Sequence, residues 1–270
     1  MEPFKITFLD TMGKTMVNTH FHNSYEIYFL IDGTRDCFIQ NHTYVLQPKD
    51  IVFFRPKAIH RTIVRDSPYI KRYVMMIPQD FVRSLALEYE GNLFKCFLNP
   101  YPVLKLQGQD YTHILNLFSR IHEEYEKHQR QPSFIISVLV TELLFYLNQL
   151  QEGTLSPHPH QEKTLSRQTI DMLMPNYHKT ITLDWLSKEL FVSTYQLCRI
   201  FKEETGFTVM EYLTFLRLKE AMQLLDTTDQ SITDIGFTVG FNNINHFIRT
   251  FKKHMSTTPK QYQLKRKSHS

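Results

Sequence analysis

The sequence predicts two domains of different fold class: an N-terminal all-β barrel with two appended helices, and a C-terminal all-α domain. Between residues 25 and 77, short runs rich in Val, Ile, Phe and Tyr are separated by Gly, Asn, Asp and Pro. This pattern is typical of antiparallel strands in a sandwich or barrel. Residues 182–255 instead carry apolar side chains at helical spacing. A chain of 270 residues is long enough to supply both domains with a core.

Six segments are predicted to be the strands of the barrel: 25–31, 36–40, 44–46, 51–55, 61–65 and 69–77. Each run consists mainly of β-branched and aromatic residues, and turn-forming residues lie between the runs. The sequence leaves open whether Met1–Lys14, which precedes them, is an ordered arm or a loose tail.

Two long helical patterns follow the strands, over 110–129 and 133–151. Apolar residues form a stripe on each, namely Ile114, Leu117, Phe118 and Ile121, and then Ile135, Leu139, Leu143 and Leu147. Such stripes must be buried. Packing on the barrel and forming a dimer interface both satisfy this requirement, and we expect both.

A segment without apolar periodicity separates the two domains. Residues 153–163 are rich in Pro, Gly, Ser and His, which is typical of an exposed linker. We therefore divide the chain into a barrel domain at 1–152, the linker, and a helical domain at 164–270. The helical domain holds 14 Lys and Arg against 10 Asp and Glu, whereas residues 1–163 hold 17 of each. All the net positive charge therefore lies in the helical domain.

Residues 182–206 and 231–255 predict two helix-turn-helix units. In the first unit the second helix is capped by Ser193, in a capping box with Gln196. In the second unit Asn242 is the expected cap. A third helix, from Thr208 to about residue 225, joins the units and is about 25 Å long, comparable to the roughly 34 Å between major-groove faces one turn apart.

The second helix of the second unit has one apolar and one polar face. Phe247 and Phe251 recur at i, i+4, and the opposite face carries Asn243, Asn245, His246, Arg249, Lys252 and Lys253. Asn and Arg suit base edges in the major groove, whereas Lys suits phosphate. A solvated surface helix would show the same pattern, but its occurrence in two similar units favours DNA reading.

From about residue 164 to 265 the chain resembles the DNA-binding domain of the AraC/XylS family of transcription regulators. The residues that carry the resemblance are Leu197, Phe201, Lys202, Gly206, Tyr212, Arg217, Ala221, Leu224, Leu225, Ile232, Ile235, Gly240, Phe241, Phe247, Phe251, Lys252, Pro259 and Tyr262. The departures are Gly236 where Ala is usual, Ser256 where Gly is common, and Gln263 where Arg usually follows the Tyr.

The resemblance implies double-stranded DNA as a partner and assigns roles within the two units. The implied base readers are Tyr195, Gln196, Arg199, Asn245, His246 and Arg249, and the implied phosphate contacts are Ser193, Lys202, Asn243 and Lys252. Alternatives remain for three of the readers. Gln196 can be used by its capping box, Tyr195 can pack against a sugar-phosphate edge, and His246 can merely cover the first helix.

Within the barrel, His20, His22 and Glu26, followed by Gly33 and the segment 56–60, resemble the two motifs of the cupin fold. In cupin enzymes such a set of three His and one Glu binds a divalent metal. Here Lys49 and Asp50 stand where the second motif usually has a Gly, and the spacing to its His is shorter. We therefore expect no metal and no cofactor, with a metal held by His20, His22, Glu26 and His60 as the alternative.

A small polyhydroxylated effector such as a sugar is the expected ligand of the barrel interior, as the family resemblance also implies. The candidate effector residues are His20, His22, Glu26, Tyr28, Arg35 and His60. The same interior face is expected for His20, His22 and Glu26, because side chains alternate along a strand.

The cysteines and the terminal sequence indicate a cytoplasmic protein. Cys37, Cys96 and Cys198 form no C-x-x-C pair, which argues against a disulfide framework and a zinc finger. No apolar run approaches the roughly 18 residues of a membrane span, and the first residues lack the apolar core of a signal peptide.

The sequence thus predicts a dimeric transcription regulator rather than an enzyme. We expect it to respond to a sugar or related effector, to activate carbohydrate-utilisation genes and, as an activator, to contact RNA polymerase. The effector is expected to act through the helices at 110–151 and the linker. Two alternatives are a metal-dependent cupin enzyme and a constitutive dimeric regulator without a ligand.

Overall fold

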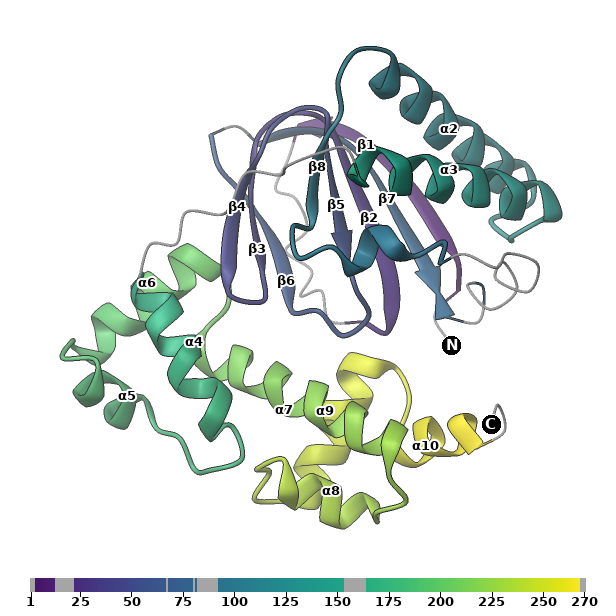
Figure 1. Ribbon diagram of the computed structural model, residues 1–270. Helices are drawn as coiled ribbons and strands as arrows, with labels where there is room; N and C mark the ends of the chain where they lie inside the picture. The colour runs from purple at the N-terminus through teal and green to yellow at the C-terminus, as the bar shows by residue number, and fades with distance from the viewer. Residues whose placement is uncertain are drawn as a thin grey trace.

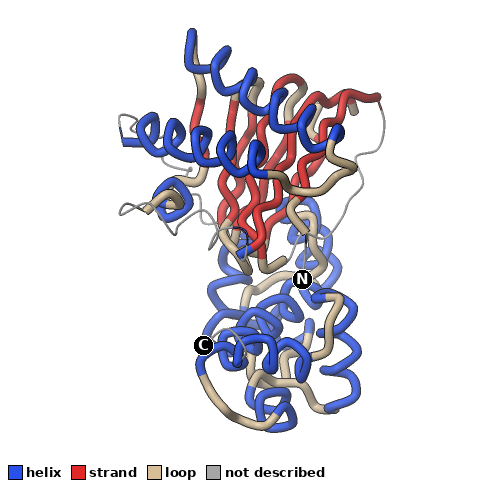
Figure 2. Tube along the Cα trace, turned by 90° about the vertical axis from the view of Figure 1, so that its right-hand side faces the viewer, coloured by secondary structure: helices blue, strands red, loops and turns tan. Residues whose placement is uncertain are grey.

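The computed structural model describes residues 3–12, 22–66, 68–79, 81, 92–152 and 164–267. A β domain with two long helices lies above a helical domain, in both views of the molecule (Figures 1 and 2). The predicted fold class is confirmed. The predicted linker lies outside the described residues, so the domain boundaries stay a prediction.

The strands form two antiparallel sheets. The five-stranded sheet has the order β1 (Lys5–Met12), β7 (Tyr69–Pro78), β2 (Ser24–Asp32), β5 (Asp50–Phe54) and β8 (Val103–Lys105). The three-stranded sheet has the order β4 (His42–Leu46), β3 (Arg35–Ile39) and β6 (His60–Val64). The six predicted strands are present. The sequence reading missed β8 and left β1 undecided. Strand β1 is ordered and pairs along its whole length with β7, from Lys5 opposite Met76 to Met12 opposite Tyr69.

Alternation along the strands gives the five-stranded sheet two apolar faces. The outer face packs against α2 (Gly108–Lys127) and α3 (Phe134–Glu152), which follow the 3-10 helix η1 (Lys95–Leu98). Phe29 and Phe118, for example, meet with ring centroids 5.2 Å apart. The inner face shares a second core with the other sheet, in which Tyr28 and Leu30 pack with Cys37.

The two predicted helical stripes are buried, with one exception. Ile135 is 49% exposed, and its neighbour Ile136 is buried instead, because Ile136 lies three residues before Leu139 on the same side of the helix. We expected no membrane-length apolar run, yet Phe134–Gln151 is long and apolar enough to cross a membrane, with a mean hydropathy of 1.4. In this fold its Leu139, Leu143 and Leu147 pack in the core of the β domain.

The helical domain contains both predicted helix-turn-helix units. Its helices are α4 (Leu165–Asn176), α5 (Leu183–Glu189), α6 (Thr194–Thr205), α7 (Val209–Thr227), α8 (Ile232–Thr238), α9 (Ile244–Met255) and α10 (Pro259–Lys267). Helices α5 and α6 form the first unit, α8 and α9 the second, and α7 joins them (Figure 1). Phe201, Phe247 and Phe251 are all fully buried in the shared core.

Two details of the predicted caps are corrected. Asn243, and not Asn242, caps α9, because its extended backbone places Oδ1 3.0 Å from the N–H of His246. At α6, Ser193 accepts the N–H of Gln196, which is half of the predicted capping box. A reciprocal box is formed at the start of α7, by Thr208 and Glu211.

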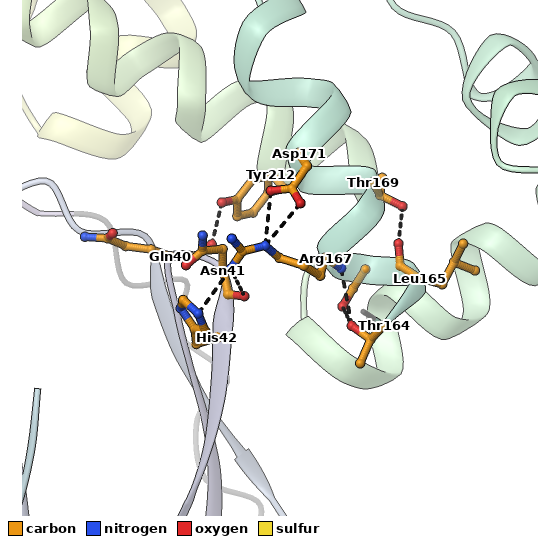
Figure 3. Close-up of polar contacts among 10 residues, drawn as sticks. Gln40, Asn41, His42, Thr164, Leu165, Arg167, Thr169, Asp171 and Tyr212 are labelled. Atoms are coloured by element: carbon orange, nitrogen blue, oxygen red, sulfur yellow. Dashed lines mark hydrogen bonds and ion pairs between the residues drawn. The ribbon is translucent and has the colours of Figure 1, made fainter. Parts of the chain in front are cut away.

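The helical domain docks on the three-stranded sheet. Phe38 of β3 packs edge-to-face on Phe207 and Tyr212, and all three lie in one hydrophobic core with Ile59. Beside this core the Tyr212 hydroxyl donates to the carbonyl oxygen of Gln40 (Figure 3). The helices α2 and α3 lie at the far end of the β domain (Figures 1 and 2). The contacts between the domains that involve described residues therefore run through the three-stranded sheet. The expected coupling route, through the helices at 110–151 and the linker, stays a prediction, because the linker lies outside the described residues.

Polar contacts from α4 add to this interface. Arg167 reaches across to the β3–β4 turn, with Nη1 3.1 Å from Nε2 of His42 and 3.4 Å from the carbonyl oxygen of Asn41 (Figure 3). The Nε of the same side chain binds Asp171 at 3.1 Å, one helical turn further along α4. The guanidinium is thus oriented from its own helix toward the sheet.

Candidate nucleic-acid interface and ligand site

The second helix of each helix-turn-helix unit presents its predicted DNA-contacting residues to solvent. Leu197 and Phe201 turn the apolar face of α6 inward, and Phe247 and Phe251 do the same for α9. Because these residues recur at i, i+4, the intervening positions face outward. None of the ten predicted contacts is buried: Ser193, Tyr195, Gln196, Arg199, Lys202, Asn243, Asn245, His246, Arg249 and Lys252.

The two outward faces differ in charge. In α6 the guanidinium of Arg199 holds both carboxylate oxygens of Glu203, at 3.1 and 2.9 Å. In α9 the corresponding position is Lys253, and Arg249 makes no ion pair with any residue that the structure describes. Glu203 is therefore a residue of this face that the sequence reading did not single out, although its i, i+4 spacing from Arg199 signalled it.

The helix α7 and the turn of the second unit are held together by Arg217. Its Nε donates to the carbonyl oxygen of Tyr177 at 2.8 Å and its Nη2 to that of Lys179 at 2.9 Å. Its guanidinium also lies 5.8 Å from the ring centroid of Phe241. This arginine accordingly links the segment that follows α4 to the α8–α9 turn of the second unit.

In the β domain, three of the predicted ligand residues form a buried cluster. Glu26 Oε2 lies 2.7 Å from Nε2 of His22 and 3.3 Å from Nε2 of His60. The Nδ1 atoms of the two rings lie 3.0 and 2.9 Å from the carbonyl oxygens of Ser24 and Ala58. A carbonyl oxygen only accepts, so each Nδ1 carries a hydrogen, and the two Nε2 atoms face the carboxylate. A proton or another cation must then lie between each Nε2 atom and the carboxylate.

Burial by itself acts to raise the pKa of Glu26, but the hydrogen bonds and charges of His22 and His60 outweigh it. The pKa of this carboxyl is held well below its usual value. A carboxyl with a lowered folded-state pKa contributes stability above its unfolded pKa and loses it as the pH falls through the folded pKa. The carboxyl of Glu26 is therefore ionised at neutral pH.

The same cluster has the chemistry of a metal site. Its three ligand atoms, two imidazole nitrogens and one carboxylate oxygen, all lie within 4.8 Å of one another. Such donors suit divalent transition metals, and the carbonyl bonds to Nδ1 are the kind of outer contact that orients metal-bound histidines. His22, Glu26 and His60 would be the residues that hold such an ion. A protonated imidazole satisfies the carboxylate equally well, so the absence of a metal stays a prediction, which metal analysis of the purified protein tests. The remaining predicted ligand, His20, lies outside the described residues.

The other two predicted effector residues, Arg35 and Tyr28, are both buried but differ in their hydrogen-bond partners. Arg35 is fully buried, and its guanidinium donates to the carbonyl oxygens of Thr34, Pro68 and Tyr69 at 2.7, 3.3 and 3.1 Å. Tyr28 lies on the inner face of the sheet, 1% exposed. The sequence reading missed Arg72 of β7, whose guanidinium lies 5.0 Å from the ring centroid of Tyr28. The sequence could have placed Arg72 on the inner face, because it lies two residues after the inward-facing Ile70 in the same strand.

One short segment contacts both the cluster and the helical domain. Within 57–61, Lys57 pairs with Asp226 of α7, and Ile59 lies in the core of the helical domain. Arg61 donates to the carbonyl oxygen of Gly206, between α6 and α7. His60, between Ile59 and Arg61 in sequence, belongs instead to the Glu26 cluster. The segment 57–61, which ends in the first residues of β6, therefore contacts both the cluster and the helical domain.

Comparison with known proteins agrees with this architecture. Residues 7–144 match the family model of the AraC-like ligand binding domain, and residues 186–265 match that of a helix-turn-helix domain. The chain is 25% identical over 227 residues to YbfI of Bacillus subtilis (strain 168), an uncharacterized HTH-type transcriptional regulator, covering 84% of this chain and 80% of that protein. It is 24% identical over 249 residues to the HTH-type transcriptional activator RhaS of Klebsiella pneumoniae (strain 342), covering 89% and 85%.

Among solved structures, ToxT from Vibrio cholerae O395 matches over 97% of this chain and 96% of that chain, at 16% identity and a TM-score of 0.40. The relatives are transcriptional regulators and not enzymes. The family model of the ligand-binding domain spans about half of the chain, and that of the helix-turn-helix domain covers the two DNA-reading units. The protein belongs to the AraC family of DNA-binding transcription regulators.

Proposed function

We propose that this regulator is a cytoplasmic, effector-responsive activator of genes for carbohydrate use. The observation that carries the proposal is the pairing of two solvent-facing recognition helices with a ligand-binding type of β domain, which meet at the segment 57–61. The name of RhaS describes that protein as an activator, and a similar role here implies contact with RNA polymerase. The effector is a sugar or a related small molecule, bound on the inner face of the β domain.

The segment 57–61, between the Glu26 cluster and the helical domain, supports an effector-dependent response. A ligand that touches the Glu26 cluster moves or fixes His60, and the same backbone carries Ile59 and Arg61 into the helical domain. Coupling requires the effector to bind one domain arrangement more tightly than another. The docked arrangement described above is one such state, and release of the helical domain from the sheet is the other.

We also propose that the regulator is a homodimer joined through α3. Phe134, Ile135, Val138 and Phe145 are 83, 49, 49 and 43% exposed on the side of this helix that faces away from the core. Apolar surface of this kind marks an interface. Phe145→Glu is expected to convert the dimer to a monomer in sedimentation equilibrium, because a buried carboxylate would lack a partner. The exposed Gln223→Glu, of equal charge but in α7 of the helical domain, should leave the dimer intact; a monomeric wild type would refute the proposal.

Selection of binding sites from random duplex DNA by the purified protein tests the proposal as a whole. Two enriched elements about one helical turn apart are expected, since both units read the major groove. Repeating the selection and the affinity measurement with a panel of sugars tests the effector. A motif whose affinity no small molecule changes would instead favour a constitutive regulator. The absence of any enriched motif would contradict specific DNA reading.

A further inference from the structure

The inner face of the five-stranded sheet holds two buried donors without acceptors. The hydroxyl of Tyr28 and the Nε of Arg72 are both inaccessible to solvent, and neither has a hydrogen-bond partner among the described residues. The two side chains adjoin, because Leu30 lies opposite Arg72 and Tyr28 opposite Val74 in the β2–β7 register. Buried polar groups are nearly always bonded in native proteins, so each exception calls for an explanation.

Among the described strands β1 to β7 and the turns between them, no carboxylate pairs with Arg72. Glu26 is held by His22 and His60. The others have partners elsewhere: Asp10 with Lys71, Asp32 with the N–H of Gly33, Asp36 and Asp66 with Arg65, and Asp50 with Lys105. Arg35, a second guanidinium of this interior, is held by backbone carbonyls. The inner face is therefore electropositive around Tyr28.

The pair lies close to the surface of the β domain, because several residues beside it are partly exposed. Arg72 is only partly buried, and so are Leu9, Val74 and Tyr44, which border the same inner core. Burial raises the pKa of Tyr28 to about 12, while the positive charges of Arg72 and Arg35 act in the opposite direction. Tyr28 consequently keeps its proton at neutral pH and is a hydrogen-bond donor, as is Arg72.

We propose that Tyr28 and Arg72 form a binding site for the carboxylate of an acidic effector, such as a sugar acid. Two donors that lack acceptors, one of them a cation, select an anionic acceptor group over a neutral hydroxyl. The inference rests on the effector response proposed above and names the class of effector. It also assigns the role of specificity to Arg72 rather than to Arg35, whose two Nη atoms donate to backbone carbonyl oxygens.

The test is the thermal stability of the full-length protein with matched pairs of probes at equal ionic strength. Galacturonate is compared with galactose and glucuronate with glucose, because each pair differs only in the carboxylate. Acetate and inorganic phosphate are added as simple anions, to separate carboxylate from phosphate binding. An acidic sugar is expected to raise the melting temperature while its neutral counterpart does not, because a ligand that binds only the folded state stabilises it.

Three variants assign the effect to the site. Arg72→Gln and Tyr28→Phe are each expected to weaken binding of the acidic sugar about tenfold, since each loses a hydrogen bond to a charged group. Lys71→Gln removes the adjacent positive charge on the other face of β7, where Lys71 pairs with Asp10, and should bind like wild type. Without ligand, Tyr28→Phe should be at least as stable as wild type, because it removes an unbonded buried hydroxyl.

The proposal fails if neutral sugars stabilise the protein as much as acidic ones, if phosphate alone does so, or if no anion does. It also fails if Tyr28→Phe keeps wild-type affinity, a result that does not depend on the folding of Arg72→Gln. DNA binding provides the separate readout. If no duplex is enriched while the acidic sugar still stabilises the wild type, the regulator function is contradicted and the anion site stands. If a duplex is enriched but no anion binds, only the anion site is contradicted.

Discussion

Replacing Gly240 by alanine is expected to destabilise the helical domain by about 2–5 kcal/mol, from backbone strain and overpacking together. Gly240 has φ +95°, a conformation that L residues rarely adopt, in the turn between α8 and α9. A Cβ there would lie 2.8 Å from the carbonyl oxygens of both Tyr177 and His178. These are backbone atoms fixed by the end of α4, so they cannot move aside as a flexible side chain would.

The fluorescence of Trp185, the single tryptophan of the chain, reports this effect from within α5 of the same domain. Gly236→Ala in α8 is the matched control. Its added Cβ would meet only side-chain atoms of Phe247 and Ile244, at 3.0 and 3.2 Å, and its backbone is helical. The gain in helix propensity of about 1 kcal/mol offsets the tighter packing, so a change near zero is expected. Equal destabilisation by the two variants would show that the turn geometry is not the cause.

Arg249→Ala is expected to weaken binding to the preferred duplex by about 1–3 kcal/mol and to relax the preference at one base position. Arg249 lies on the outward face of α9 and is not engaged by a carboxylate of the described residues, so its planar donors are free to pair with a guanine edge. Arg199 of α6 is held by Glu203, and this pair must be shared or broken when α6 reads DNA. The loss on Arg199→Ala should therefore be smaller.

Lys252→Ala provides the comparison, measured by titration of binding against salt on the preferred duplex and on a scrambled one. Lys252 lies in the last turn of α9, where a lysine suits phosphate. The substitution should weaken binding to both duplexes alike and reduce the slope of log affinity against log salt by about 1. If Arg249→Ala also weakened both duplexes equally, Arg249 would be a phosphate contact and not a base reader.

Local sequence was sufficient for most of the helical domain. Helix periodicity, the Thr208 and Glu211 box and the apolar pairs of the recognition helices depend on residues three or four positions apart. Where the local signal was degenerate, the prediction was wrong. Asn242 and Asn243 are equally good caps by residue type, and only the backbone at Asn243 decides between them.

The sequence by itself therefore determined the two helix-turn-helix units, six of the strands and the His and Glu residues of the inner face, because each follows from a short repeat of residue types. Only the tertiary structure placed β1 along β7 and set Arg72 beside Tyr28. It also decided that the helical domain docks on the three-stranded sheet through 57–61. These contacts join residues far apart in the chain, and local periodicity carries no information about which distant strand or helix a face will meet.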